Sequence, residues 1–300
     1  MTLPSHVKIY EVGPRDGLQN EKQNVTTNVK VELIERLADT GINMIEATAF
    51  VSPDAVVQMA DHVDVMAKIK RKKDVTYSVL VPNERGMITA IESGVREVAV
   101  FTSASEDFSQ KNINCSIEES LFRFKPVISL AKMENIKVRG YVSCVIACPY
   151  EGDIDPEKVA NISARLYEIG CYEISLGDTI GIATPEKTRS MIGAVSAIIP
   201  TENLALHFHD TYGYALDNLR VGLEEFGIST IDSSVGGLGG CPYAQGATGN
   251  VATEDVIHML NGLGIETGVD LSAIIDTAWF ISNHLGRKPV SKTANLSPIY

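Results

Sequence analysis

The sequence predicts an α/β fold, a (β/α)₈ TIM barrel with additional C-terminal helices. Short β-branched or apolar runs alternate with longer segments of helical periodicity, and the alternation repeats eight times. Alternating strands and crossover helices imply a parallel sheet, and eight such units fit a closed barrel better than an open sheet. A doubly wound sheet is the alternative, but no G-x-G-x-x-G motif opens a helix after the first predicted strand.

The strand positions follow from the short runs. Strands are expected to begin near Val7, Asn43, Val75, Glu97, Val138, Tyr172, Leu204 and Thr230. After the eighth strand, further helices are predicted over residues 253–263 and 271–285. We therefore expect one catalytic domain over residues 1–300, with the barrel over about residues 7–265 and a helical extension over about residues 266–300.

The helices are predicted from periodicity and from their end signals. Over residues 28–40, Val29, Leu33 and Leu37 share one face, and Gly41 follows the segment. Two later helices are expected to begin at the pairs Asp155-Pro156 and Thr184-Pro185, because proline suits the first helical turn. Three helix ends are expected at Gly94, Gly170 and Gly227.

Composition narrows the class of protein. Hydrophobic residues make up 44% of the chain, which allows a sizeable core, and the net charge of −12 argues against a nucleic-acid partner. No apolar run is long enough to span a bilayer, so no membrane partner is expected. The five cysteines are odd in number and dispersed, which suits a reducing compartment and predicts a cytoplasmic protein. The thiols other than Cys241 are expected to be buried, namely Cys115, Cys144, Cys148 and Cys171.

One basic run, over residues 68–73, is the only concentrated positive charge. A phosphate or nucleic-acid patch is one interpretation, and a solvated turn is the favoured one. The run precedes the third predicted strand, so we expect it on the amino-terminal face of the barrel, away from any active site.

Two histidines on one strand predict a metal site. His207 and His209 are two residues apart, so both imidazoles point to the same side of a strand. A satisfied core histidine is the alternative, but a pair favours ligands. With Asp16 after the first strand and the amide oxygen of Asn250, they form a mixed nitrogen and oxygen set that suits Mg²⁺ or Mn²⁺.

Other polar residues also follow strands and should converge at the same end of the barrel. Glu46 and Asp178 are expected beside the substrate, where they orient ligands or arginine. For both residues, a structural ion pair with Arg15 is the alternative. After the eighth strand comes a glycine-rich segment, residues 235–250, that carries Cys241. So much backbone freedom around one thiol indicates a functional loop, although a linker with an incidental buried thiol is the simpler interpretation.

Several of these motifs together resemble the 3-hydroxy-3-methylglutaryl-CoA lyase family, over nearly the whole chain. The matching segments are residues 11–21, 50–53, 175–181 and 207–210 and the Cys241 loop. The resemblance implies cleavage of 3-hydroxy-3-methylglutaryl-CoA to acetyl-CoA and acetoacetate, with a divalent cation held by Asp16, His207, His209 and Asn250. It also implies a homodimer that acts in leucine or ketone-body metabolism on a small-molecule acyl-CoA.

The chemistry that the resemblance implies needs three groups. Arg15 offers a charged fork to the thioester oxygen, where negative charge develops. Asp16 takes the proton of the tertiary hydroxyl, and Cys241, the family's catalytic thiol, returns a proton to the enolate carbon. Lys22 and Lys111, both on loops after strands, are expected to anchor the CoA phosphates.

Three other functions remain open on the sequence alone. One is a lyase that acts on a related 3-hydroxyacyl-CoA, since the fold and the metal site would be the same. A condensing synthase of the same barrel group would typically carry a Gly-x-Gly-Glu-Arg-x-Gly-Asn pattern in the last loop, whereas this chain has Cys241-Pro242 there and no Glu-Arg pair. A non-catalytic sensor of acyl-CoA or metal would lack an acid or base, yet Arg15, Asp16 and Cys241 are all present.

Overall fold

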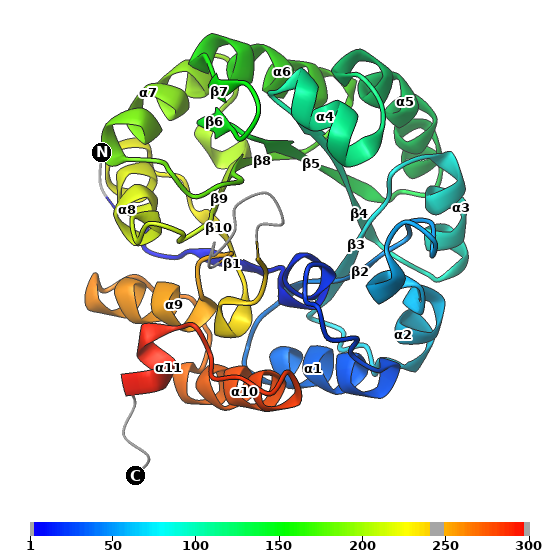
Figure 1. The fold of residues 1–300 in the computed structure, drawn as a ribbon, viewed down its shortest axis with the longest axis vertical. Coiled ribbons are helices and arrows are strands. Elements are labelled where there is room, and N and C mark those ends of the chain that lie inside the picture. Colours follow the sequence, from blue (N-terminus) through cyan, green and yellow to red (C-terminus); the bar gives the residue numbers. More distant parts are fainter. Residues whose placement is uncertain (1–2, 241–248, 297–300) are drawn as a thin grey trace.

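Eight parallel strands close into a barrel in the computed structural model, which describes residues 3–240 and 249–296. The strands, in sequence order, are β1 (Lys8–Glu11), β2 (Met44–Ala49), β3 (Thr76–Leu80), β4 (Glu97–Ser103), β5 (Lys137–Ser143), β8 (Glu173–Asp178), β9 (Leu204–Phe208) and β10 (Thr230–Ser233). Around the barrel they follow the order β1-β10-β9-β8-β5-β4-β3-β2 (Figure 1). The predicted fold and all eight strand positions are confirmed.

Helices surround the barrel (Figure 1). They are α1 (Thr27–Asp39), α2 (His62–Lys68), α3 (Glu84–Glu92), α4 (Glu106–Ile113), α5 (Ile117–Met133), α6 (Pro156–Ile169), α7 (Pro185–Ser196), α8 (Ala215–Phe226), α9 (Thr253–Gly262), α10 (Leu271–His284) and α11 (Lys292–Leu296). The predicted starts are confirmed, because the side chains of Asp155 and Thr184 accept hydrogen bonds from the first turns of α6 and α7. Gly170 and Gly227 end α6 and α8 with positive φ angles.

Some short elements are absent from the sequence prediction. A π-helical turn (Gly13–Gly17) follows β1, and single 3₁₀ turns occupy Val57–Met59, Thr201–Asn203 and Val235–Gly237. A small antiparallel hairpin, β6 (Ala147–Cys148) with β7 (Gly152–Asp153), lies between β5 and α6. Two-residue strands and single turns are too short to produce a detectable periodicity, so only the folded chain reveals them.

The C-terminal helices extend the barrel on one side. Helix α10 packs against α1, α9 and the turn Val235–Gly237, and α11 packs against α9 and α10 (Figure 1). Asp255, in α9, accepts hydrogen bonds from the Oγ of Ser291 and from the backbone amides of Lys292 and Thr293. The extension therefore supports the turn from which the glycine-rich segment leaves the barrel.

The basic run and the cysteines lie where the sequence predicted. Residues 68–73 connect α2 to β3 at the amino-terminal end of the strands, and their charged side chains are exposed. Arg71 uses its guanidinium to cap the carbonyls of Ser93 and Gly94. Of the cysteines within the described ranges, all four are free and buried. Across residues 3–240 and 249–296, each helix is too short or too polar to traverse a lipid bilayer.

Candidate metal centre and active site

The two histidines meet Asp16 at the carboxyl end of the barrel. Asp16 lies in the π-helical turn after β1, His207 in β9, and His209 one residue beyond that strand. One ligand atom from each of the three side chains lies within 4.8 Å of the others. Ring centroids of His207 and His209 are 5.6 Å apart. The structure thus brings together three of the four side chains predicted to hold a metal.

Asn250, the fourth predicted ligand, lies beside Asp16. Its Nδ2 donates to the Oδ2 of Asp16 at 2.8 Å and to the carbonyl of Leu238 at 3.2 Å. Gly249 makes this approach possible: its φ is +86°, and a Cβ there would collide with the carbonyl oxygen of Gly239. Two parts of the glycine-rich segment, at Gly239 and Gly249, therefore touch directly beside Asp16.

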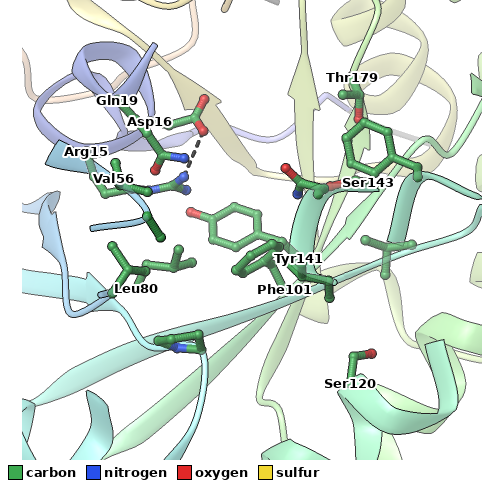
Figure 2. A pocket seen from close by; sticks show the side chains of 18 of the residues that line it. Arg15, Asp16, Gln19, Val56, Leu80, Phe101, Ser120, Tyr141, Ser143 and Thr179 are labelled. Carbon is green, nitrogen blue, oxygen red and sulfur yellow. Dashed lines mark hydrogen bonds and ion pairs between the residues drawn. The ribbon is translucent and has the colours of Figure 1, made fainter. Parts of the chain in front are cut away.

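Arg15 is held rigidly between two carboxylates. Its Nε donates to Glu46 Oε2 at 2.6 Å and its Nη1 to Asp16 Oδ1 at 2.7 Å, and Figure 2 shows the second contact as a dashed line. Glu46, in the middle of β2, is fully buried and forms the ion pair with Arg15 that was anticipated as an alternative to ligand orientation. Its second oxygen, Oε1, is buried and has no hydrogen-bond partner within the described residues.

The charges of the cluster suit a cation. Burial alone would raise the pKa of Asp16, but Arg15 and the two histidines outweigh it and lower the pKa to about 2. Burial and the neighbouring His207 lower the pKa of His209 to about 4, so its imidazole is neutral near pH 7. Its Nδ1 is buried with no partner in the described part of the chain. An ionised carboxylate beside a neutral imidazole with an unused nitrogen is a donor set that fits a divalent metal ion.

Asp178, the last residue of β8, is oriented by the following loop. Its Oδ2 accepts the backbone amide of Ala183 at 2.8 Å, while Oδ1 is buried and, among the described residues, has no partner. Burial raises the pKa of Asp178 to about 6. Asp178 is near enough to His207 to feel its charge, but it does not line the cavity described next.

A cavity of about 460 Å³ opens beside the cluster. Its walls include Arg15, Asp16, both histidines and aromatic side chains such as Phe101. Figure 2 shows Arg15, Asp16 and Phe101 among the side chains around it. An adjoining cleft of about 490 Å³ is lined by Lys22. The two spaces share Gln19, Asn20, Ala55, Val56 and Asn112 in their walls.

The remaining predicted residues lie further from the cluster or outside the described ranges. Lys111 is on α4, with its ammonium 3.4 Å from the centroid of the Tyr150 ring, so its charge already has a partner. Cys241 lies outside the described residues. Gly240, which precedes it, lines the main cavity.

Sequence reasoning missed Tyr141, which projects from β5 into the cavity (Figure 2). Its ring centroid is 5.5 Å from the guanidinium carbon of Arg15 and 6.0 Å from the ring of His207. Its hydroxyl is buried and, within the described ranges, makes no hydrogen bond. The signal was present, because Arg139, Tyr141 and Ser143 alternate along one strand and so face the barrel interior together.

Sequence reasoning also missed the buried charges beneath the cluster. Asp232 of β10 accepts from Arg139 of β5 at 2.7 and 2.9 Å, and His207 Nδ1 lies 3.2 Å from the same carboxylate. Glu11 of β1 accepts from the amides of Gly13 and Val235, and thereby joins the turn that carries Asp16 to the turn after β10. These contacts link distant strands, so no local pattern reveals them.

Comparison with known proteins gives consistent results. The HMGL-like family model matches residues 6–281. The chain is 57% identical over 292 residues to hydroxymethylglutaryl-CoA lyase, mitochondrial, of Gallus gallus, covering 97% of this chain and 98% of that one. It is also 57% identical to 3-hydroxy-3-methylglutaryl-CoA lyase, cytoplasmic, of Danio rerio, covering 97% of this chain and 87% of that relative.

Solved structures give the same picture. The crystal structure of hydroxymethylglutaryl-CoA lyase from Pseudomonas aeruginosa matches with a TM-score of 0.96 and 54% identity, covering 98% of each chain. An HMG-CoA lyase from Acinetobacter baumannii, in complex with coenzyme A and 3-methylmalate, matches with a TM-score of 0.93 and 35% identity over 100% of both chains.

Proposed function

The chain belongs to the HMGL-like family, and we infer that it is a lyase that cleaves 3-hydroxy-3-methylglutaryl-CoA to acetyl-CoA and acetoacetate. The observation that carries this conclusion is the cluster of Asp16, His207 and His209, with Arg15 beside it, at one end of an open cavity. The full-length likeness to lyases that bear this name supports the same reaction.

A divalent cation, Mg²⁺ or Mn²⁺, belongs to the proposal. Asp16, His207, His209 and Asn250 would hold it, and the fit rests on the ionised carboxylate and on His209 Nδ1, which has no partner among residues 3–240 and 249–296. When bound, such a cation acts as a Lewis acid on the hydroxyl and carboxylate oxygens of the substrate. A pKa of about 2 makes Asp16 a good ligand and a weak base, so its ligand role has better support than proton removal.

Arg15 is the proposed partner of the thioester oxygen. Its Nε and Nη1 are occupied by carboxylates, which fixes the plane of the guanidinium and, as far as the described residues go, leaves Nη2 to donate into the cavity. A preorganised donor of this kind stabilises the enolate oxygen as charge develops there. Glu46 is proposed to orient the guanidinium of Arg15 toward the substrate, and its hydrogen bond with Arg15 Nε supports this role.

Cys241 is proposed to return the proton to the enolate carbon, by analogy with the family, since Gly240 lines the cavity immediately before it. Asp178 is proposed to contact substrate with weaker support, because its Oδ1 has no partner among the described residues but the residue does not line the cavity. Lys22 is proposed to bind the CoA phosphates, since it lines the cleft that adjoins the cavity. Lys111 is proposed in the same role with weaker support, because its ammonium packs on Tyr150.

The setting of the enzyme is also a proposal. We place it in the cytoplasm as a homodimer, with the barrel and the C-terminal helices as one catalytic domain. Some relatives are named as cytoplasmic and others as mitochondrial, so the dispersed free cysteines remain the main support for this location. Packing of α10 against α1 and the turn Val235–Gly237 supports the single domain.

The test is product release by the purified protein. Acetyl-CoA and acetoacetate should appear from 3-hydroxy-3-methylglutaryl-CoA in the presence of Mg²⁺, and EDTA should abolish their release. A Cys241→Ser variant should retain cation binding and lose most turnover. Turnover that persists after complete removal of metal would refute the cation, and no turnover with intact cation binding would point to a different acyl-CoA.

A further inference from the structure

Asp232 lies directly beneath His207, on the strand next to it. In the ladder between β9 and β10, Asp232 pairs with His207, and both side chains face the barrel interior. His207 Nδ1 is 3.2 Å from Asp232 Oδ2, while His207 Nε2 is 3.9 Å from Asp16 Oδ2. One ring nitrogen therefore faces the interior carboxylate and the other faces the cation cluster.

Asp232 cannot rotate away from this position. Arg139 grips both of its oxygens, with Nη1 at 2.9 Å from Oδ2 and Nη2 at 2.7 Å from Oδ1. Ser175 Oγ donates to Oδ2 at 2.7 Å. The carboxylate thus accepts three hydrogen bonds, two of them from a guanidinium, and this arrangement of donors holds it as an anion.

An anionic carboxylate can only accept a hydrogen bond. His207 must therefore carry a hydrogen on Nδ1, and in the neutral ring the lone pair then lies on Nε2, toward Asp16. His209 differs, because its Nδ1 has no partner among the described residues and nothing there fixes its tautomer. Among the described residues, a side chain therefore fixes the tautomer of His207 before metal binds, and none does so for His209.

We propose that Asp232 is a positioning residue that fixes the ring and the tautomer of His207 so that Nε2 is presented to the cation. The inference rests on the proposed cation site and adds a residue that the sequence motifs do not contain. Arg139 has a supporting part, because it holds the carboxylate in place from the opposite wall of the barrel. Carboxylates that accept from a ligating imidazole both orient the ring and raise its affinity for metal.

The decisive variant is Asp232→Asn, which keeps the shape and removes the charge. An asparagine amide can donate as well as accept, so the ring is free to adopt the tautomer that places a hydrogen on Nε2. Glu173→Gln is the matched control. Glu173 is also buried inside the barrel and accepts from Arg139 Nε at 2.7 Å, but its other contacts are Lys8 and Thr230.

The first measurement is the affinity for Mn²⁺, determined by titration with the electron paramagnetic resonance signal of the unbound ion as the readout. We expect Asp232→Asn to weaken binding about 10- to 100-fold and Glu173→Gln to change it less than about threefold. Equal weakening in both variants would show that the buried ion pairs merely hold the barrel together, and would overturn the proposal. Wild-type affinity in Asp232→Asn would overturn it too. A wild-type protein that binds no Mn²⁺ would instead refute the proposed metal centre and, with it, this role.

The second measurement uses no variant at position 232, so it can be made even if Asp232→Asn does not fold. The ¹⁵N chemical shifts of the His207 ring report its tautomer in the metal-free wild-type protein at a pH at which the ring is neutral. The spectrum of a His207→Gln variant identifies which signals belong to this ring. We expect hydrogen on Nδ1 and a bare Nε2. Hydrogen on Nε2, or a mixture of both forms, would overturn the proposal even if the protein binds cation normally.

Discussion

Replacement of Arg15 by lysine tests whether the fixed guanidinium is needed at the site, because lysine keeps the positive charge but lacks the planar group with several donors. Arg15 donates from two different nitrogens to Glu46 at 2.6 Å and to Asp16 at 2.7 Å. A lysine ammonium is a point charge on a flexible stem, so it cannot hold both carboxylates and still present a fixed donor to the cavity.

The contacts set the size of the effect. Loss of one buried hydrogen bond to a charged group costs about 1.5–3 kcal/mol of stability. The upper part of this range applies, because the Arg15 side chain is only 8% exposed and Glu46 Oε1 already lacks a partner within the described residues. Loss of a preorganised oxyanion donor lowers kcat about 10²- to 10³-fold. Ground-state binding through the CoA portion should persist, so KM should change little.

The assay combines steady-state release of acetoacetate with unfolding in urea. Arg71→Lys is the matched control, because Arg71 lies on the amino-terminal face, away from the site, and caps the carbonyls of Met66, Ser93 and Gly94. The control should leave kcat unchanged. If Arg15→Lys retained kcat within about threefold of the wild type, the fork would have no role in charge stabilisation and the reasoning would be refuted.

Three further predictions follow from the same contacts. Tyr141→Phe should leave the free energy of unfolding unchanged or slightly higher, because the hydroxyl has no partner among the described residues. It should lower kcat/KM about two- to tenfold, which corresponds to the loss of one hydrogen bond to the substrate. Unchanged kinetics would show that the Tyr141 hydroxyl does not contact the substrate. Lys22→Ala should raise KM for the acyl-CoA several-fold at constant kcat, and a fall in kcat alone would contradict phosphate binding. Burial raises the pKa of Glu254 from 4.5 to about 8, so the folded protein keeps a proton that the unfolded chain releases. The contribution of Glu254 to the free energy of unfolding is therefore fully present below about pH 4.5 and is lost as the pH rises to about 8. In the Glu254→Gln variant, the urea midpoint should fall less steeply over this pH range than in the wild type. Equal slopes for the two proteins would refute the assignment.

The sequence alone predicted the eight strands, the helices that follow them and the strand ends at which polar residues gather. These features are local, since a strand or helix imposes its own period on neighbouring residues and a cap needs only one side chain near the helix end. The pair His207 and His209 was predictable for the same reason: two residues apart on a strand means one face.

Partners across the barrel were decided only by the tertiary structure. Nothing near His207 in the sequence indicates that Asp232 faces its ring, or that Arg139 grips that carboxylate from another strand. Tyr141 likewise enters the site because closure brings β5 opposite the turn that carries Arg15. The physical reason is that periodicity fixes which way a side chain points, whereas the residue that it meets depends on strand register and barrel closure, which involve the whole chain.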